Sequence, residues 1–424
     1  MTEAPRSRGL STSYSLLDTD GGLPVDRTAT LTPRHCHKDP HLTWAAPLPG
    51  DPPRCFLVFK KWGDGEAYDV ALSLGRFLTA CGARVLRMPS EGDDKPLPAE
   101  FEVVAVEAQG APGARPGGGG GGGGGGGSGS VPLSGIDLVV CVGGDGSLLR
   151  ASALFPRECP PFIAVGRGGS LGFLTVHTPA SARALLALLL HTQPAGFASP
   201  KMSDASDAFT PQPPPAALPP GVLLPLACAA TPPGTAVVSR RMRLRVDVYQ
   251  RGGGAAGARL TGSHVALNEV LLSRGAATYM AQVDAFVDGL PLTTVLADGL
   301  IVSTQTGSTA YALSAGGPML SPNASCISIV PICPHTLSFR PIVFDETAVI
   351  HLVVPPAARA PAAVVCDGLN VAELQPGDYV VVCASNWPLP LLARRSPTAD
   401  WLAGIREKML WNMRGAEQRK MRSS

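Results

Sequence analysis

The chain has 424 residues, a formal net charge of +2 and a charged fraction of 16%. Its length allows two domains with additional tails, and its balanced charge excludes the basic surface with which proteins bind nucleic acid. No apolar run in the sequence is long enough to cross a bilayer, so we expect no membrane partner.

The cysteines and the N-terminal composition indicate the compartment. Ten cysteines occur without a Cys-x-x-Cys pair, and we expect them to be reduced and mostly buried. Acidic residues stand early in the chain, at Glu3 and Asp18, whereas transit peptides are poor in acidic residues. We therefore expect a cytoplasmic protein, with a plastid location left open.

The N-terminal part predicts an α/β domain behind a tail. Residues 1–50 are polar and punctuated by proline and glycine, which predicts a disordered tail. Residues 51–192 are expected to form an α/β nucleotide-binding domain. It begins with a strand at 55–60, a helix at 66–80 and a second strand at 84–87.

Two segments of low complexity interrupt this plan. An unbroken glycine run at 117–127 lies within an expected flexible linker at 109–135, because glycine cannot offset its ordering entropy by burying a side chain. Residues 193–236 are rich in proline and alanine, and we expect a surface insertion there.

The most informative motif is Gly143-Gly144-Asp145-Gly146, which directly follows the apolar segment 136–142. That segment predicts a buried parallel strand, and open α/β sheets bind ligands beyond the carboxyl ends of their strands. Glycines let phosphate oxygens approach backbone N–H groups, and a helix that begins here favours an anion at its N-terminus. A carboxylate beside a phosphate suits a metal bridge or proton removal from an attacking hydroxyl. The motif indicates phosphoryl transfer, while a tight turn without chemistry is the structural alternative.

Other nucleotide and nucleophile motifs do not fit. Leu149 stands where a dinucleotide-binding fingerprint needs its third glycine, and no Gly-x-x-x-x-Gly-Lys-Ser/Thr occurs. The protein-kinase motifs are also missing from the sequence. Gly168-x-Ser170-x-Gly172 resembles a nucleophile elbow, but no helix pattern starts at the serine. A hydrolase is therefore disfavoured.

The second half predicts an all-β domain over residues 237–392. From Arg241 onwards apolar residues alternate with polar ones, which is typical of a strand with one buried face. Further short segments of strand character follow at 264–273, 280–287, 299–303, 348–354, 363–366 and 379–383.

Two polar groups in this half suit a nucleotide. Asn268-Glu269 ends an apolar stretch, and the segment 298–311 runs from Asp298 through small hydroxyl residues to Tyr311. Carboxylates, amides and hydroxyls can bind ribose hydroxyls or an exocyclic amine. Tyr311 can stack on a base or fill the core, and its residue type alone favours the core.

Together these blocks resemble the eukaryotic NAD kinases. The resemblance runs from about residue 42 to about residue 414, interrupted by the two low-complexity segments. Its blocks are 143–146, 169–175, 268–269, 298–311, 331–341 and 400–414. It implies a Rossmann-like α/β domain followed by an all-β domain, as in the NAD kinase and diacylglycerol kinase folds. It also implies transfer of the ATP γ-phosphoryl group to the 2′-hydroxyl of the adenosine ribose of NAD, with Mg²⁺ accompanying ATP, by a homo-oligomer.

The resemblance also implies residue roles. Asp145 would remove the 2′-hydroxyl proton, and Gly143, Gly144 and Gly146 would hold the ATP phosphates. The NAD-binding residues would be Asn268, Glu269, Tyr279, Asp298, Thr309, Ala310 and Tyr311. Two positions depart from the family pattern: Gln305 replaces a usual proline, and Arg167 replaces a usual asparagine or histidine.

Two other functions remain open from the residues. A lipid kinase of the diacylglycerol or sphingosine type shares the glycine-rich turn, but it would need an apolar acceptor groove where Asn268, Glu269 and Asp298 stand. A non-catalytic NAD-binding protein would leave the carboxylate of Asp145 beside the phosphates without a role.

The C-terminal segment 393–424 is expected to form a helix that packs back on the α/β domain. Apolar residues recur every four positions, at Trp401, Ile405, Met409 and Met413. Basic residues nearby make a calmodulin target the alternative. Packing is favoured because the stripe would otherwise leave tryptophan and methionine exposed.

Overall fold

The structure is a computed structural model. It describes residues 42–45, 55–89, 93, 95–105, 131–166, 172–190, 235–251 and 258–412. Most of the predicted tail, the glycine run, most of the Pro/Ala-rich insertion, Arg167 and Met413 lie outside the described residues.

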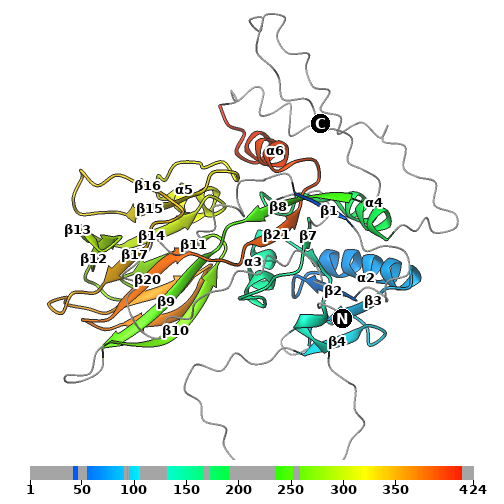
Figure 1. Cartoon of the computed structure of the whole chain (residues 1–424), viewed down its shortest axis with the longest axis horizontal. Coiled ribbons are helices and arrows are strands. Elements are labelled where there is room, and N and C mark those ends of the chain that lie inside the picture. The colour runs from blue at the N-terminus through cyan, green and yellow to red at the C-terminus, as the bar shows by residue number, and fades with distance from the viewer. Residues whose placement is uncertain are drawn as a thin grey trace, which may run out of the picture.

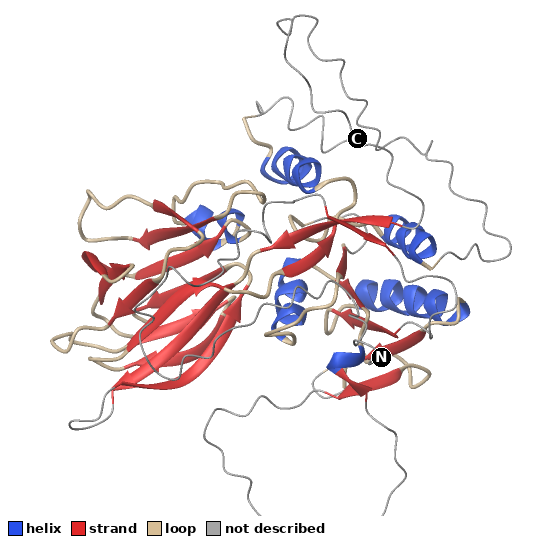
Figure 2. Cartoon of the chain, in the orientation of Figure 1, coloured by secondary structure: helices blue, strands red, loops and turns tan. Residues whose placement is uncertain are grey.

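A nine-stranded, mostly parallel sheet forms the first half of the molecule, and helices lie on both of its faces (Figures 1 and 2). Its strand order is β1-β8-β21-β7-β6-β2-β3-β4-β5. The strands are β1 Leu42–Ala45, β2 Cys55–Lys60, β3 Arg84–Arg87, β4 Glu102–Ala105, β5 Val131–Pro132, β6 Leu138–Val142, β7 Phe162–Val165, β8 Thr235–Arg241 and β21 Leu389–Leu392. The helices beside it are α2 Gly65–Ala80, α3 Asp145–Ala153, α4 Pro179–Leu189 and α6 Pro397–Met409, with a short 3-10 turn η1 at Leu133–Gly135.

Strand β2 shows why this sheet is buried on both faces. Its even-numbered apolar residues Phe56 and Val58 pack in a cluster with residues of α2 and α4. The alternate residues Leu57 and Phe59 pack with Leu148 of α3 on the other face. A strand with two buried faces reads as a continuous apolar run, as the sequence of this strand does.

The second half consists of two antiparallel six-stranded sheets. One has the order β10-β9-β20-β17-β12-β13, and the other has the order β16-β15-β14-β11-β18-β19. The strands are β9 Leu244–Arg251, β10 Ala258–Ala266, β11 Glu269–Ser273, β12 Ala281–Val287, β13 Leu290–Ala297, β14 Gly299–Thr304, β15 Cys326–Ile332, β16 Ile342–Asp345, β17 Ile350–Val353, β18 Ala362–Cys366, β19 Leu369–Leu374 and β20 Tyr379–Ala384. A 3-10 turn η3, Gly307–Thr309, and a one-turn helix α5, Tyr311–Ser314, follow β14.

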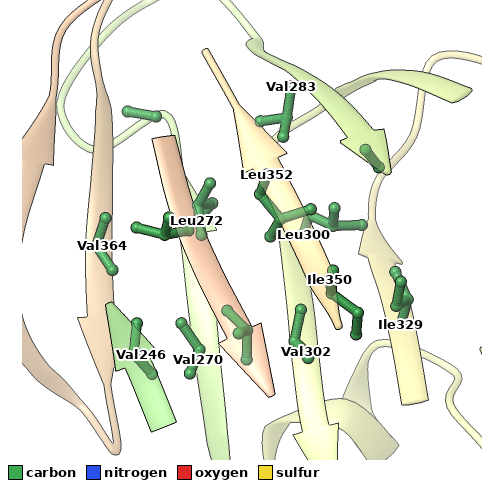
Figure 3. Close-up of a cluster of buried hydrophobic side chains, with 14 of the residues drawn as sticks. Val246, Val270, Leu272, Val283, Leu300, Val302, Ile329, Ile350, Leu352 and Val364 are labelled. Atoms are coloured by element: carbon green, nitrogen blue, oxygen red, sulfur yellow. The ribbon is translucent and has the colours of Figure 1, made fainter. Parts of the chain in front are cut away.

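The two antiparallel sheets share one apolar core (Figure 3). Val246 and Leu352 come from the first sheet, whereas Leu300, Ile329 and Val364 come from the second, and all five are buried. Aliphatic side chains from two facing sheets interdigitate in this way in β-sandwiches. The predicted order of an α/β part followed by an all-β part is confirmed.

Three strands depart from the predicted boundaries. Strand β1 falls inside the predicted tail 1–50 and pairs with β8. Strands β8 and β21 lie in the first sheet, although the prediction places most of β8 and all of β21 within residues 237–392. A strand pattern shows which residues alternate but not which sheet the strand joins, because sheet membership depends on distant partners.

The chain therefore passes between the two halves twice. It runs from β8 into β9 at Met242–Arg243, and it returns from β20 to β21 through residues 385–388. Within the described part of the chain, every helix is too short or too polar to cross a membrane.

The buried imidazole of His177 predicts an acid-sensitive fold. Its Nε2 lies 3.0 Å from the carbonyl oxygen of Leu392, and burial lowers the pKa of His177 to about 4. An unfolded histidine titrates near 6.5, so the unfolded chain takes up a proton between pH 6.5 and 4 that the native chain does not. The contribution of His177 to stability therefore falls by about 2 kcal/mol between pH 7 and 5, whereas Glu269, whose pKa is raised to about 7 by burial, contributes in the opposite direction.

Urea unfolding at pH 7 and pH 5 measures this effect. His177→Gln should change the difference between the free energies of unfolding at pH 7 and pH 5 by about 2 kcal/mol relative to the wild type, whereas His335→Gln, at an exposed site, should leave it unchanged. An unaltered pH dependence in His177→Gln would show that other groups cause the acid sensitivity.

Candidate active site

The glycine-rich motif forms the turn from β6 into α3. Gly143 follows the strand, and its N–H donates to the carbonyl of Val165 at the end of β7. Gly144 is the N-cap of α3, where no side chain caps the helix. A Cβ at Gly144 or Gly146 would meet no atom of the described residues within 4 Å. The turn thus leaves open space beside the positive end of a helix dipole, which suits a phosphate.

Asp145 begins α3, and its carboxylate accepts four hydrogen bonds. The N–H groups of Leu174 and Thr175 and the Thr175 hydroxyl donate to Oδ1, each at 3.1 Å. The N–H of Phe173 donates to Oδ2 at 2.9 Å. Among the described residues, Oδ2 thus has one donor and Oδ1 has three. These hydrogen bonds fix the orientation of the carboxylate, and Oδ2 keeps a lone pair for a further proton or ligand.

The loop 172–175 fits the carboxylate closely. A Cβ at Gly172 would lie 2.1 Å from Oδ1 of Asp145, so no other residue type fits at 172 without displacing the carboxylate. The Thr175 hydroxyl also accepts a hydrogen bond from the N–H of Gly172, at 2.8 Å. Thr175 is fully buried. This loop belongs to the block 169–175 of the resemblance, but nothing in the sequence marks Thr175 as a support of Asp145.

The opposite end of α3 is held by Arg243, which is fully buried. Its guanidinium donates to the carbonyls of Phe155 at 2.6 Å, Arg157 at 2.9 Å and Trp387 at 2.6 Å. A cation is favourable beside the carbonyls that follow a helix. Burial lowers the pKa of Arg243, and the charges of Cys159 and Asp367 oppose this effect. Arg243 thus ties the chain segment between the two halves to the helix that carries Asp145.

A second buried arginine, Arg241, lies on the same connecting segment. It is 5% exposed, and its Nε has no hydrogen-bond partner among the described residues. Burial lowers the pKa of Arg241 to about 10, while the negative charges of Asp400 and Asp145 act against that shift. Arg241 therefore lies within the electrostatic influence of both the α3 carboxylate and helix α6.

Asp367 holds the backbone of the Asn268-Glu269 pair through hydrogen bonds. Its carboxylate accepts the N–H groups of Leu267 at 2.6 Å, Asn268 at 2.8 Å and Glu269 at 3.1 Å. Asp367 has a φ of +47° and stands with Gly368 in the two-residue turn between β18 and β19. Asp-Gly is a favoured pair for such a hairpin turn. This dipeptide was the available signal, but the sequence analysis did not connect it with the site.

The end of β14 makes further hydrogen bonds to this segment. The N–H of Thr304 donates to the carbonyl of Asn268 at 2.9 Å, and the Thr304 hydroxyl donates to the carbonyl of Leu267 at 2.7 Å. The side chain of Leu267 lies in the same apolar cluster as Leu148 of α3. Asn268 is thereby fixed close to the helix that carries Asp145.

Four buried polar atoms in these two segments have no hydrogen-bond partner among the described residues. They are Oδ1 of Asn268, Oε2 of Glu269, Oε1 of Gln305 and Oγ1 of Thr306. Buried polar atoms are nearly always paired in native proteins, so such a group points to a missing ligand. An amide, a carboxylate and a hydroxyl suit an exocyclic amine or ribose hydroxyls. Gln305 and Thr306 were not among the predicted site residues, although the hydroxyl-rich run that contains Thr306 was noted.

Glu269 is the titratable member of this group. Burial, with a further contribution from the charge of Asp367, raises the pKa of Glu269 to about 7. The carboxyl group therefore changes its charge within the physiological range. A ligand that donates hydrogen bonds to it favours the ionised form.

The structure divides the predicted NAD-binding residues into two groups. Thr309, Ala310 and Tyr311 lie just after Thr306, and the Thr309 hydroxyl donates to the Thr306 carbonyl at 3.2 Å. The other group, Asp298 and Tyr279, lies near the far end of β11. Glu269 pairs with Ser303, whereas Ser273 pairs with Gly299, and four residue steps along a strand span about 14 Å.

Asp298 and Tyr279 each have a charged neighbour. Oδ1 of Asp298 lies 2.8 Å from Nε of Arg274. The ring of Tyr279 is 53% exposed and lies 5.7 Å from the guanidinium of Arg359. The structure therefore does not bring Asp298 and Tyr279 to Asn268 within one chain.

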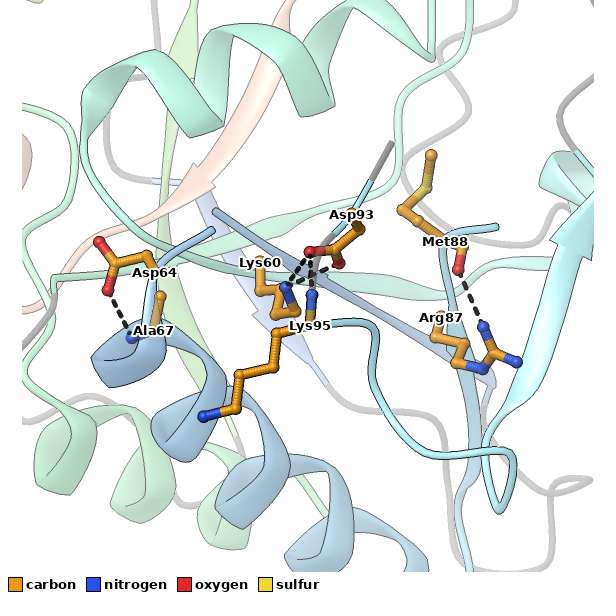
Figure 4. A network of polar contacts seen from close by, with 7 residues as sticks. All are labelled: Lys60, Asp64, Ala67, Arg87, Met88, Asp93 and Lys95. Atoms are coloured by element: carbon orange, nitrogen blue, oxygen red, sulfur yellow. Dashed lines mark hydrogen bonds and ion pairs between the residues drawn. The ribbon is translucent and has the colours of Figure 1, made fainter. Parts of the chain in front are cut away.

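Lys60 and Asp93 form a buried ion pair beside the glycine-rich turn (Figure 4). Lys60 ends β2 and pairs in register with Val142, the residue before Gly143. Its Nζ lies 2.7 Å from Oδ2 of Asp93, and the two side chains are 4% and 7% exposed. This cation at the carboxyl edge of the sheet was not identified from the sequence, since a single lysine has no motif.

The donors near Asp145 fit a metal that arrives with its nucleotide. No cluster of three or more His, Cys, Asp or Glu side chains suited to a metal occurs in the part of the chain that the structure describes. Mg²⁺ is usually held by one or two carboxylates together with substrate phosphates and water. Asp145 beside an open phosphate site matches that donor set.

Comparison with known families agrees with this geometry. Residues 56–194 match the ATP-NAD kinase N-terminal domain, and residues 267–393 match the ATP-NAD kinase C-terminal domain. Together the two matches cover more than half of the chain.

Relatives in plants and yeast are similar over the same region. The chain is 34% identical over 279 residues to the chloroplastic NAD kinase 2 of Arabidopsis thaliana, covering 66% of this chain and 24% of that protein. It is 34% identical over 284 residues to an NAD(+) kinase of Saccharomyces cerevisiae, covering 67% of this chain and 46% of that protein. The chain thus matches less than half of the length of these two relatives.

Two solved structures share the fold. The yeast NADH kinase complexed with NADH has a TM-score of 0.60 and 21% identity, covering 88% of this chain and 94% of that chain. The NAD kinase of Archaeoglobus fulgidus in complex with ATP has a TM-score of 0.50 and 20% identity, covering 83% and 98% of the two chains.

Arg243→Met should destabilise the protein strongly, because three buried carbonyls would lose their donor. We expect the free energy of unfolding to fall by about 3 kcal/mol. Arg245→Met is the matched control, since Arg245 pairs with Asp247 through a half-exposed side chain and should cost about 1 kcal/mol or less. Urea unfolding measures both. Equal losses would mean that Arg243 does not join the two halves.

Proposed function

The chain belongs to the NAD kinase family, and we propose that it transfers the γ-phosphoryl group of ATP to the 2′-hydroxyl of the adenosine ribose of NAD. The observation that carries the proposal is Asp145, an aimed carboxylate at the N-terminus of α3 with open space at Gly144 and Gly146. A base and an anion site that adjoin in this way are the two elements that phosphoryl transfer requires.

The proposed reaction uses Oδ2 of Asp145, which has a single donor among the described residues. The 2′-hydroxyl gives its proton to Oδ2 while its oxygen forms a bond to the γ-phosphorus. The bond from that phosphorus to the β,γ-bridging oxygen breaks, and ADP leaves with the electron pair. Phosphoryl transfer depends mainly on such positioning and on charge stabilisation.

The N-terminus of α3 would bind the transferred phosphate. Gly144 and Gly146 present backbone N–H groups without bulk, whereas Gly143, whose N–H is bonded to the carbonyl of Val165, would contribute only the absence of a side chain. The ion pair of Lys60 with Asp93 lies at the same edge of the sheet. Mg²⁺, when bound with ATP, would neutralise developing charge on the phosphates. Asp145 is the described carboxylate that is placed to share it.

The adenosine of NAD would bind at the four unpaired atoms. Asn268, Glu269 and Thr306 offer acceptors and a hydroxyl for an exocyclic amine and for ribose hydroxyls. Tyr311, which is 44% exposed at the start of α5, would stack on the base, with Thr309 and Ala310 beside it. This polar lining suits a dinucleotide better than the apolar acceptor of a lipid kinase.

We further propose a homo-oligomer and two domains, at 51–192 and 237–392, except that β8 and β21 belong to the sheet of the first domain. Tyr279 is exposed and Asp298 is half-buried, and both lie away from Asn268 in one chain. They would therefore serve the NAD site only at the far end of the dinucleotide or in a neighbouring copy. Sedimentation equilibrium of the purified chain tests the oligomeric state.

Asp145→Asn tests the chemistry. The amide cannot take up the hydroxyl proton, so kcat for NADP formation should fall by about 10²- to 10⁴-fold. Binding of ATP and NAD, measured by calorimetry, should change little. Asp69→Asn, at an exposed position of α2, should keep full activity. Near wild-type turnover in Asp145→Asn would rule out Asp145 as the base.

Glu269→Ala tests the acceptor site. Loss of a buried partner should weaken NAD binding by about 1–3 kcal/mol and leave ATP binding nearly unchanged. Glu373→Ala, at an exposed position, should change the binding of neither nucleotide.

Because the pKa of Glu269 is raised to about 7, the fraction of its ionised form increases between pH 6 and 8, so the affinity for NAD should rise over that range. Glu269→Gln should abolish this rise. Equal weakening of both nucleotides would instead make Glu269 a structural residue.

A further inference from the structure

Helix α6 lies on the loop that holds the carboxylate of Asp145. It begins after Ser396, whose hydroxyl accepts the N–H of Ala399. Asp400 in its first turn accepts the N–H of Arg394 at 2.9 Å, which fixes the helix to the end of β21. Figure 1 shows α6 next to the ends of β8 and β21.

Helix α6 comes close to this loop at Gly404. A Cβ at this position would lie 2.9 Å from Cδ1 and 3.0 Å from Cε1 of Phe173. Gly404 is buried in the middle of a helix of 13 residues, where glycine is less favourable than alanine. Its presence is explained by the Phe173 ring, which occupies the space of a side chain.

Phe173 connects this contact to the reacting group. Its own N–H donates to Oδ2 of Asp145 at 2.9 Å, and the next two N–H groups, of Leu174 and Thr175, donate to Oδ1. A side chain at 404 would push the ring and, with it, the segment whose N–H groups aim the carboxylate. The charges of Asp400 in α6 and of Asp145 both act on the pKa of the buried guanidinium of Arg241, against the effect of burial.

We propose that Gly404 is a positioning residue for the reaction: by lacking a side chain, it lets α6 seat Phe173 so that residues 173–175 aim Asp145. The inference rests on the proposed function. It assigns to the C-terminal helix a role in turnover rather than in nucleotide binding, since α6 reaches the base through Phe173 and not through Asn268 or Glu269.

Gly404→Ala and Gly404→Val test the proposal in the full-length protein. A small displacement of a catalytic group costs up to about 100-fold in rate, so we expect kcat to fall by roughly 10-fold for alanine and more for valine. The KM values for ATP and NAD should stay within about 2-fold, because the hydrogen bond of Phe173 leads to Asp145 and not to Asn268 or Glu269. Leu402→Ala, on the exposed side of the same helix, should keep wild-type kinetics.

A double-mutant cycle with Phe173→Ala separates positioning from general loosening of the helix. Without the ring there is space at 404, so Gly404→Ala should lower kcat by less than about 2-fold in the Phe173→Ala background. Thermal unfolding of each variant records stability separately. An undiminished loss of kcat in that background would overturn the coupling through Phe173.

The two proposals fail in different ways. A wild-type protein that makes no NADP from ATP and NAD would refute the proposed function. An active wild type whose Gly404 variants keep their kcat would refute only the role of Gly404. A rise in KM with unchanged kcat would also refute it, because that result assigns α6 to nucleotide binding.

Discussion

The guanidinium of Arg243 is the interaction on which the arrangement of this molecule depends. It stands where the chain passes from β8 to β9, and it binds carbonyls after α3 and the carbonyl of Trp387 on the return path. Both connections between the α/β sheet and the β-sandwich therefore meet at one buried cation. A buried charge is tolerated only when its donors are satisfied. Because the carbonyls that satisfy Arg243 lie on both connections, they restrict the position of the two halves relative to each other.

The geometry of the candidate active site depends on this relative position of the two halves. Asp145 begins the helix whose end Arg243 holds, and Leu267 packs beside Leu148 of the same helix. Asp367 then fixes Asn268 and Glu269 through three backbone N–H groups. The proposed base comes from one half and the proposed acceptor site from the other, and a rigid joint between the halves is what keeps their separation constant.

The buried polar groups of the candidate site lower the stability of the folded protein. Four polar atoms are buried without partners among the described residues, and burial raises the pKa of Glu269 to about 7. Unpaired buried groups cost free energy that a folded protein otherwise avoids. A dinucleotide that donates hydrogen bonds to these atoms would recover this cost on binding. Gln305 belongs to this group, so its replacement of the usual proline places a polar group among the binding atoms.

The sequence by itself determined the local features of this protein. The glycine-rich turn with Asp145, the Asn268-Glu269 pair and the hydroxyl-rich run before Tyr311 depend on residue type and spacing, as does the order of α/β and β elements. These features follow from short-range conformational preferences, which act between neighbours in the chain. Tertiary structure alone decided which distant groups serve them. Arg243, Thr175 and Gly404 carry no local signal for their roles, and the Asp-Gly pair at Asp367 predicts only a turn. Strands β8 and β21 joined the first sheet, and Asp298 was placed away from Glu269. The physical reason is that packing and hydrogen bonding between residues far apart in sequence select those partners, and periodicity within a segment carries no information about them.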